Sequence, residues 1–216
     1  MNNCIPRKDV DDKMDIIYCT RKCRINAAER YKFLDQLLLA INTYYSAFLI
    51  ILSVIFLLNS NPIGIGIMLI SLSILTFTFN AICMSLQFKD RYYSFKANYI
   101  ELGALYNELK LIDCDADNSR SIFEEITKKY DLLLNMCENH TTYDYYKFLI
   151  NDHNALDKKF AYIEDQKLKK SSIDGIKKYY YYRLILKFIF FALLVSVPFI
   201  TPYLVNIIKI FILNAY

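Results

Sequence analysis

The residue types that most often carry chemistry are few in this chain of 216 residues, and they are dispersed. There are six cysteines and two histidines, His140 and His153. Cys19 and Cys23 lie one helical turn apart, but no second cysteine pair or neighbouring histidine completes a zinc-binding set. We therefore interpret the thiols as reduced cytosolic side chains, and we expect neither a metal site nor a cofactor.

The sequence also lacks the short motifs of the common catalytic centres. It contains no Gly-rich phosphate loop, no nucleophile elbow and no His-Glu-x-x-His helix. Glu124 and Glu125 fall at an expected helix start, where carboxylates favour the helix dipole. His153 falls on an expected apolar helix face, which indicates a packed histidine more than a sensing or catalytic one. We expect no enzymatic activity.

The most informative polar residues are uncharged and lie within an apolar stretch. At about 100° per residue they project from one side of a helix. This candidate pore-lining face comprises Ser73, Thr76, Asn80 and Gln87. Asn80 is the most telling member, because a buried amide needs a partner or water. Two explanations stay open: a water-facing conduit lining, or hydrogen bonds between helices.

In each of the two halves of the same stretch, small polar residues recur at intervals of seven. Small side chains at that spacing form a seam along which two helices approach closely. The candidate helix-packing seam comprises Ser46, Ser53, Ser71, Thr78 and Ser85.

The element that carries both sets is a run from Gln36 to Phe88 without any Asp, Glu, Lys or Arg. A bilayer-spanning helix needs about 20 apolar residues, so two spans fit, at 39–58 and 63–86. Asn59 to Pro62 would form the turn between them. The alternative is a buried hairpin in a soluble protein, which fits less well because the chain is 55% hydrophobic.

Polar helices are expected on both sides of this hairpin. Phe88, Tyr92, Phe95, Tyr99, Leu102, Tyr106 and Leu109 alternate steps of four and three, which predicts that the second span continues as one long helix. Ser121 to Glu124 reads as a capping box. Further buried stripes run from Phe123 to Cys137 and from Tyr146 to Ile163. Residues 1–12 look frayed, and an amphipathic helix follows from about Lys13.

A third apolar segment lies near the C-terminus and carries no charge from Phe188 to Ile208. It contains Pro198 and Pro202, which favour a kinked span; a re-entrant or interfacial helix is the alternative. The expected fold class is all-α: an integral membrane protein with a transmembrane hairpin, cytosolic helices and a C-terminal apolar helix. Its parts are residues 1–38 (cytosolic amphipathic helix), 39–86 (hairpin), 87–183 (cytosolic helical bundle) and 184–213 (third membrane helix).

Three stretches resemble the SLATT family of bacterial membrane proteins. They are Arg24 to Arg30 before the first span, the charge-free hairpin with its short turn, and Arg91 to Leu109 after the second span. Together they cover roughly residues 20–112, and the third apolar segment lies beyond this two-span pattern. SLATT proteins have two membrane helices with cytosolic helices around them, and they occur in nucleotide-linked antiviral defence loci.

The resemblance implies an effector of antiphage defence that a partner or nucleotide signal activates. Such an effector would oligomerise, form a pore or ion channel or disrupt the inner membrane, and stop growth or kill the cell as in abortive infection. A nucleotidyltransferase or reverse transcriptase from the same locus is the expected partner. The alternative is a non-conducting anchor or scaffold for a partner defence protein. The net charge is only +4, with basic residues beside the apolar segments, so we expect no direct nucleic acid binding.

Basic residues predict the orientation in the bacterial inner membrane. Lys and Arg flank the first span on its N-terminal side, follow Phe88 and precede Phe188, whereas the 59–62 turn has none. The N-terminus and central helices should therefore be cytoplasmic, and the C-terminus outside. A reporter inserted at Asp115 should be cytoplasmic, and one fused after Tyr216 should be external. Two cytoplasmic reporters would show that the third segment does not cross.

Overall fold

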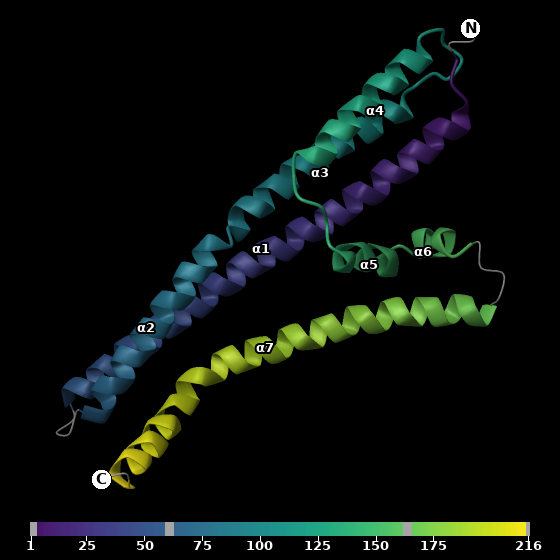
Figure 1. Cartoon of the computed structure of the whole chain (residues 1–216). Helices are drawn as coiled ribbons and strands as arrows, with labels where there is room; N and C mark the ends of the chain where they lie inside the picture. Colours follow the sequence, from purple (N-terminus) through teal and green to yellow (C-terminus); the bar gives the residue numbers. More distant parts are fainter. Residues whose placement is uncertain (1–3, 59–62, 162–165, 215–216) are drawn as a thin grey trace. The chain divides into compact units, whose positions relative to one another are not determined.

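In the computed structural model of this chain, the described residues are 4–58, 63–161 and 166–214, and their regular secondary structure is entirely helical. The helices are α1 (Arg7–Leu58), α2 (Ile63–Ser85), α3 (Phe88–Lys110), α4 (Ser119–Asn135), α5 (Thr142–Asn151), α6 (His153–Lys159) and α7 (Gln166–Asn214) (Figure 1). Three helical stretches each contain a window long and apolar enough to cross a bilayer: Arg7–Leu58, Gly66–Lys110 and Lys167–Val197. The all-α fold with three apolar spans is confirmed. The expected turn at 59–62 lies outside the described residues.

The chain forms two compact units. Unit 1 comprises residues 1–32 and 89–181, and unit 2 comprises residues 33–88 and 182–216. The boundaries coincide with the ends of the charge-poor segments. Unit 1 therefore contains most of the charged residues, whereas unit 2 contains the hairpin and the C-terminal apolar segment.

Helix α1 begins earlier than the sequence indicated. It starts at Arg7, not near Lys13, and continues without interruption to Leu58. The early start has a packing reason, because Val10 and Ile17 are fully buried and Ile5 is 8% exposed. No Pro or Gly interrupts these 52 residues, as a continuous helix requires.

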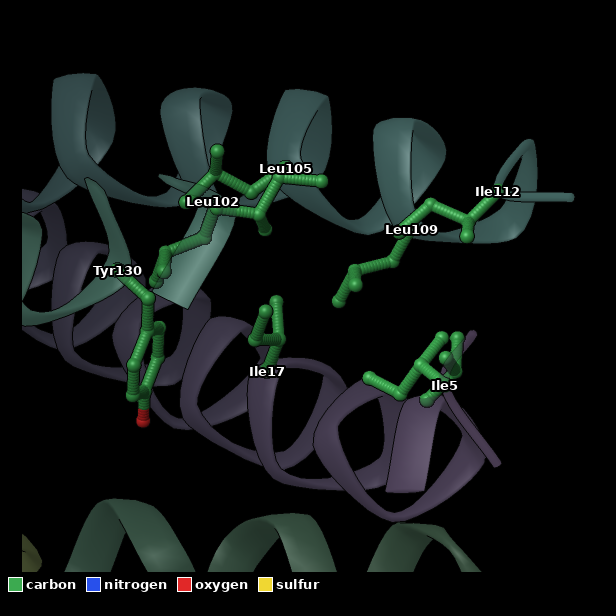
Figure 2. Packing of buried hydrophobic residues seen from close by; sticks show 9 residues of the cluster. Ile5, Ile17, Leu102, Leu105, Leu109, Ile112 and Tyr130 are labelled. Atoms are coloured by element: carbon green, nitrogen blue, oxygen red, sulfur yellow. The ribbon is translucent and has the colours of Figure 1, made fainter. Parts of the chain in front are cut away.

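The first core of unit 1 is formed by α1, α3 and α4. Its buried members are Ile5, Val10, Ile17, Leu102, Leu105, Leu109, Ile112, Ile126 and Tyr130. Figure 2 shows the α1 side chains facing those of α3, with Tyr130 of α4 alongside. Phe95, Leu102 and Leu109 of the predicted stripe are all fully buried. The four–three spacing therefore identified the inner face of α3 correctly.

The expectation of one unbroken helix from the second span into this core was wrong. Helix α2 ends at Ser85 and α3 begins at Phe88. Gln87 has a φ of 48°, in the left-handed region that non-glycine residues adopt at a cost of about 1–2 kcal/mol. The amides of Leu86 and Gln87 bond carbonyls three residues earlier, as in the last turn of a tightened helix end.

The second core of unit 1 joins α1 to α5, α6 and the start of α7. Its buried members are Cys23, Phe148, Leu149, Leu156, Phe160 and Ile176. The single helix expected here is divided, because Asp152 accepts a bond from the Ala155 amide at 3.0 Å and thereby starts α6. This break changes the helical register, so His153 is exposed rather than packed. Ile163 lies outside the described residues.

The polar centre of unit 1 is Asp144, whose side chain is fully buried. Its two carboxylate oxygens accept bonds from Arg30 Nε and Nη2, each at 3.0 Å. Oδ2 also accepts from the Thr141 amide at 3.0 Å and hydroxyl at 2.8 Å. Asn26 Nδ2 donates to the Asp144 carbonyl at 2.9 Å. These contacts hold the start of α5 against α1 and satisfy a charge that would otherwise be costly to bury.

The capping box of this region is therefore Thr141 with Asp144, not Ser121 with Glu124. Helix α4 begins at Ser119, which places Ser121 inside the helix, and Glu124 instead pairs with Arg120 at 3.5 Å. Both sites have a hydroxyl residue three positions before an acid. Only Thr141 stands directly before a helix. The sequence pattern alone therefore could not distinguish the two sites, because a capping box also requires that the helix begin just after the hydroxyl residue.

Arg24 is a second fully buried charge in unit 1. Its Nη1 donates to the Glu138 carbonyl and to Cys137 Sγ, just beyond the end of α4, where helix carbonyls lack partners. The guanidinium also lies 5.4 Å from the centroid of the Phe95 ring. Burial, followed by the nearby Arg24 charge, lowers the pKa of half-buried His140. The histidine that the fold places in a buried setting is thus His140.

The Asp144 network gives a stability test of unit 1. Asp144→Asn keeps the side-chain size but leaves the Arg30 charge without its partner, and we expect a loss of about 3 kcal/mol. Urea titration of the full chain in mild detergent, followed by far-ultraviolet circular dichroism, measures this loss. Asp11→Asn is the matched control, because Asp11 pairs with Arg7 at 3.1 Å at the exposed surface. Equal unfolding midpoints for the two variants would contradict this role of Asp144.

Candidate functional site

The charge-free hairpin of unit 2 is joined by a hydrogen bond between two amides. Asn80 Nδ2 in α2 donates to Asn42 Oδ1 in α1 at 2.9 Å, and both residues are half-buried. An amide surrounded by hydrocarbon has no water to bond, so this bond gives the Asn80 N–H group and the Asn42 side-chain oxygen a partner. Interhelical bonding, one of the two explanations open for Asn80, is therefore present within the single chain.

Tyr45, one turn after Asn42, links the same face of α1 to α7. Its hydroxyl donates to the Leu194 carbonyl at 2.6 Å, and the ring is only 5% exposed. Tyr44 makes a longer bond of 3.3 Å to the Val195 carbonyl. Leu194 precedes Pro198 by four residues, and proline has no N–H with which to bond that carbonyl. The phenol thus supplies the donor that the α7 helix lacks.

We call this arrangement the polar junction and define it as Asn42, Tyr45, Asn80 and the Leu194 carbonyl. Two residues of α1 use it to reach both other helices of unit 2. Polar groups at membrane depth are costly and are found mostly where helices are held together or where a polar path is needed. The polar junction is therefore the candidate functional site.

A cavity of about 500 Å³ adjoins the polar junction. Its lining residues are Asn42, Tyr45, Ser71, Ile74, Leu75, Thr76, Thr78, Phe79, Ile82, Leu194 and Val197. The hydroxyls of Ser71, Thr76 and Thr78 bond carbonyls of their own helix at 2.8–2.9 Å. The cavity consequently presents a largely apolar wall, which suits a hydrocarbon chain or a helix better than a file of water.

The candidate pore-lining residues are only partly brought together. Thr76 lines the cavity and Asn80 belongs to the polar junction, whereas Ser73 is exposed and bonds the Leu69 carbonyl at 2.8 Å. Gln87 lies in the break after α2, so its position no longer follows the helical spacing from Asn80. A lining role for Ser73, Thr76 and Asn80 stays a prediction about an assembly, and Gln87 cannot be placed on that helical face.

The candidate seam lies away from the contact between α1 and α2. Ser46, Ser53, Ser71, Thr78 and Ser85 are all exposed in the single chain. The hairpin contact instead uses Leu52, Met68 and Leu72, and a Cβ added at Gly66 would lie 3.2 Å from the Phe56 ring. The seam therefore remains a prediction that concerns contacts between copies.

Asn42 and Tyr45 were not among the site residues predicted from the sequence. Asn42 was open to the same argument as Asn80, because it is an amide within a charge-free run. Pro198 indicated a carbonyl without its helical donor, but the sequence did not indicate which helix would supply one.

Among the described residues, no group of three or more His, Cys, Asp or Glu side chains could hold a metal ion. The Cys19 thiol raises the pKa of Cys23 through a hydrogen bond, and burial adds to this shift.

Removing the hydroxyl group of Tyr45 should weaken unit 2. Tyr45→Phe keeps the ring but leaves the Leu194 carbonyl unbonded, and interhelical bonds in membranes contribute about 0.6 kcal/mol, at most about 1.7. Unfolding in mixed SDS and mild detergent, followed by circular dichroism, measures the difference. Tyr203→Phe is the control, because Tyr203 lies in α7, the helix that carries Leu194, and is 72% exposed. If Tyr45→Phe is as stable as that control, the bond contributes nothing.

Comparison with known proteins identifies the family. The model of SMODS and SLOG-associating 2TM effector domain family 5 matches residues 7–208. The match therefore extends well beyond the stretch of about 20–112 that carried the resemblance, and it includes most of α7. Neither curated proteins nor solved structures gave a match. Because the family model covers nearly the whole chain, this protein belongs to SMODS and SLOG-associating 2TM effector domain family 5, and it is a membrane effector domain of the kind found in defence systems.

Proposed function

We propose that this chain is an antiphage effector whose activated copies assemble in the bacterial inner membrane and open a conduit or disrupt the bilayer, causing growth arrest or cell death. The trigger would come from a partner of the same defence locus or from its nucleotide signal. The N-terminus and unit 1 would be cytoplasmic and the C-terminus outside, as the basic flanks predict. The family membership supports the effector role, and the polar junction supports the conduit.

The observation that carries this proposal is the amide pair of Asn42 and Asn80. A simple membrane anchor needs no amides in its spans, and apolar side chains would hold its helices at lower cost. In a single chain the Asn80 amide donates to the Asn42 side-chain oxygen. If α2 turns so that Asn80 meets water, the hydrogen bond to Asn42 is replaced by one to water, which makes two alternative arrangements accessible.

The energies involved fit a switch. An interhelical hydrogen bond of this kind contributes about 0.6 kcal/mol on average. Moving a two-state equilibrium from 1:99 to 99:1 takes about 5.5 kcal/mol of differential binding, which one partner protein can supply. The amide pair can therefore hold the resting arrangement without preventing activation.

A conduit also requires several copies. Three helices cannot enclose water, because each backbone and polar face must be covered within the membrane. Ser73 is exposed in the single chain, and Thr76 and Asn80 are half-buried on the same side of α2. In an assembly, these side chains of neighbouring copies would face a common axis.

The proposal predicts a separation between packing and conduction. Asn80→Leu leaves Asn42 unpaired, so it should lower stability by about 1 kcal/mol and also reduce ion flux and growth arrest. The double variant Asn42→Leu with Asn80→Leu removes both amides and should recover the stability, yet it should still conduct poorly. A voltage-sensitive dye measures depolarisation during phage infection with the whole locus present.

The scaffold alternative makes the opposite prediction for the double variant. Once packing is restored, a non-conducting anchor should protect cells as the native chain does. Full protection and unchanged depolarisation in the double variant would therefore contradict a lining role for Asn80. If the native chain never depolarises infected cells that carry the whole locus, the conduit itself is excluded.

A further inference from the structure

Helix α3 has an apolar stripe on the side opposite its core contacts. Tyr93, Ala97, Ile100, Ala104 and Asn107 alternate steps of four and three, and all five are exposed. We call these residues the outer stripe. Tyr93 and Ile100 are each 53% exposed, and Leu111, the next step in the spacing, is 84% exposed just beyond the helix end. This pattern is separate from the buried stripe of Phe95, Leu102 and Leu109.

The rotation along the helix places the two stripes on opposite faces. At about 100° per residue, Ile100 and Leu102 are separated by a rotation of about 200°, so they point to nearly opposite sides of the helix. The inner stripe packs against α1, which accounts for its composition. Burial within unit 1 does not account for a regular apolar line on the outer face, and such lines in soluble units commonly mark an interaction surface.

The spacing of the outer stripe is that of a coiled coil. Ala97 and Ala104 occupy a positions, with Leu111 next, while Tyr93, Ile100 and Asn107 occupy d positions. Alanine at a allows two helices to approach closely. An asparagine in an apolar seam lowers stability, and the Asn107 amide finds a polar partner most directly in the same amide on an identical helix. These features favour a second copy of α3 over an unrelated helix.

The charges beside the stripe agree with a parallel pair of α3 helices. Lys96 stands at a g position and Glu101 at the following e position, so a parallel partner places Lys96 against Glu101 in both directions. An antiparallel pair would place like charges together. The charges therefore select the parallel arrangement.

We propose that the outer stripe is a self-association surface, through which α3 of one copy packs in parallel against α3 of a second copy. This inference rests on the proposed function, which requires several copies to assemble. It goes further by assigning the contact between copies to a named face of unit 1, outside the membrane spans.

A charge placed in the centre of the stripe tests this assignment. Ala104→Lys brings two like charges together in the seam and should weaken association about tenfold or more. Light scattering of the full chain in mild detergent, over a range of concentrations, measures particle mass. Leu132→Lys is the matched control, because Leu132 is 66% exposed on α4 and receives the same change to a charge. The control should keep the native mass.

A charge exchange tests the pairing itself. Lys96→Glu and Glu101→Lys should each weaken association about fivefold, since each creates two repulsive pairs. The double variant restores opposite charges and should recover most of the native association. The Lys96 ammonium also lies 5.9 Å from the Tyr92 ring centroid. The single variant Lys96→Glu and the double variant both lack this cation–π interaction. Any recovery of association from the single to the double variant therefore reports on the restored pair of opposite charges.

The outcomes separate this inference from the proposed function. If the native chain is assembled and Ala104→Lys keeps the native mass, the outer stripe does not join the copies, although a conduit could still form. Effects that add in the double charge variant instead of cancelling would likewise overturn the parallel pairing. If Ala104→Lys disperses the assembly but the native chain never depolarises cells, the self-association surface stands and the conduit does not.

Discussion

A hydrogen-bonding group within a bilayer has no water to replace a missing partner, and unit 2 is arranged around this constraint. Pro198 deprives the Leu194 carbonyl of its helical donor, and the Tyr45 hydroxyl supplies one at 2.6 Å. One turn away, Asn42 pairs with Asn80 at 2.9 Å. Asn42 and Tyr45 thereby connect α1 to α2 and to α7. The asparagine side chains that hold the resting chain together are also the polar groups on which the conduit proposal depends.

Unit 1 meets the related problem of burying charge, most fully at Asp144. Asp144 meets the guanidinium of Arg30 and the cap of α5, so the carboxylate is bonded on both oxygens. Two apolar cores, both built on α1, complete the unit. Between the parts of the chain that form the two units, Gln87 adopts a left-handed φ of 48° and ends α2. A non-glycine residue in this conformation has a backbone cost that a continued α-helix would have avoided. The break between α2 and α3 is therefore a specific feature of this chain.

Periodicity predicted the elements well and their junctions poorly. Charge-free length located the spans, and the four–three spacing located the inner face of α3, since burial of an apolar stripe is what fixes a helix face. The breaks at Gln87 and Asp152 depend on single backbone or side-chain bonds, which periodicity does not record. The same limit explains His153, which the break at Asp152 turns outward, and Tyr45, whose carbonyl partner lies about 150 residues away in sequence. The resemblance, by contrast, predicted the family correctly from less than half of the chain.

The central claim is that Asn80 exchanges its amide partner for water when the effector is activated. A single cysteine at that position, Asn80→Cys in a chain whose native cysteines are replaced by serine or alanine, tests it with a small, charged thiol reagent that does not cross lipid. Ile70→Cys serves as a control, because Ile70 lies on the same helix, is 63% exposed in the single chain and does not line the cavity. In infected cells with the whole locus, the account predicts that residue 80 becomes reactive as growth stops while residue 70 stays protected by lipid. Growth arrest with residue 80 still unreactive would contradict it.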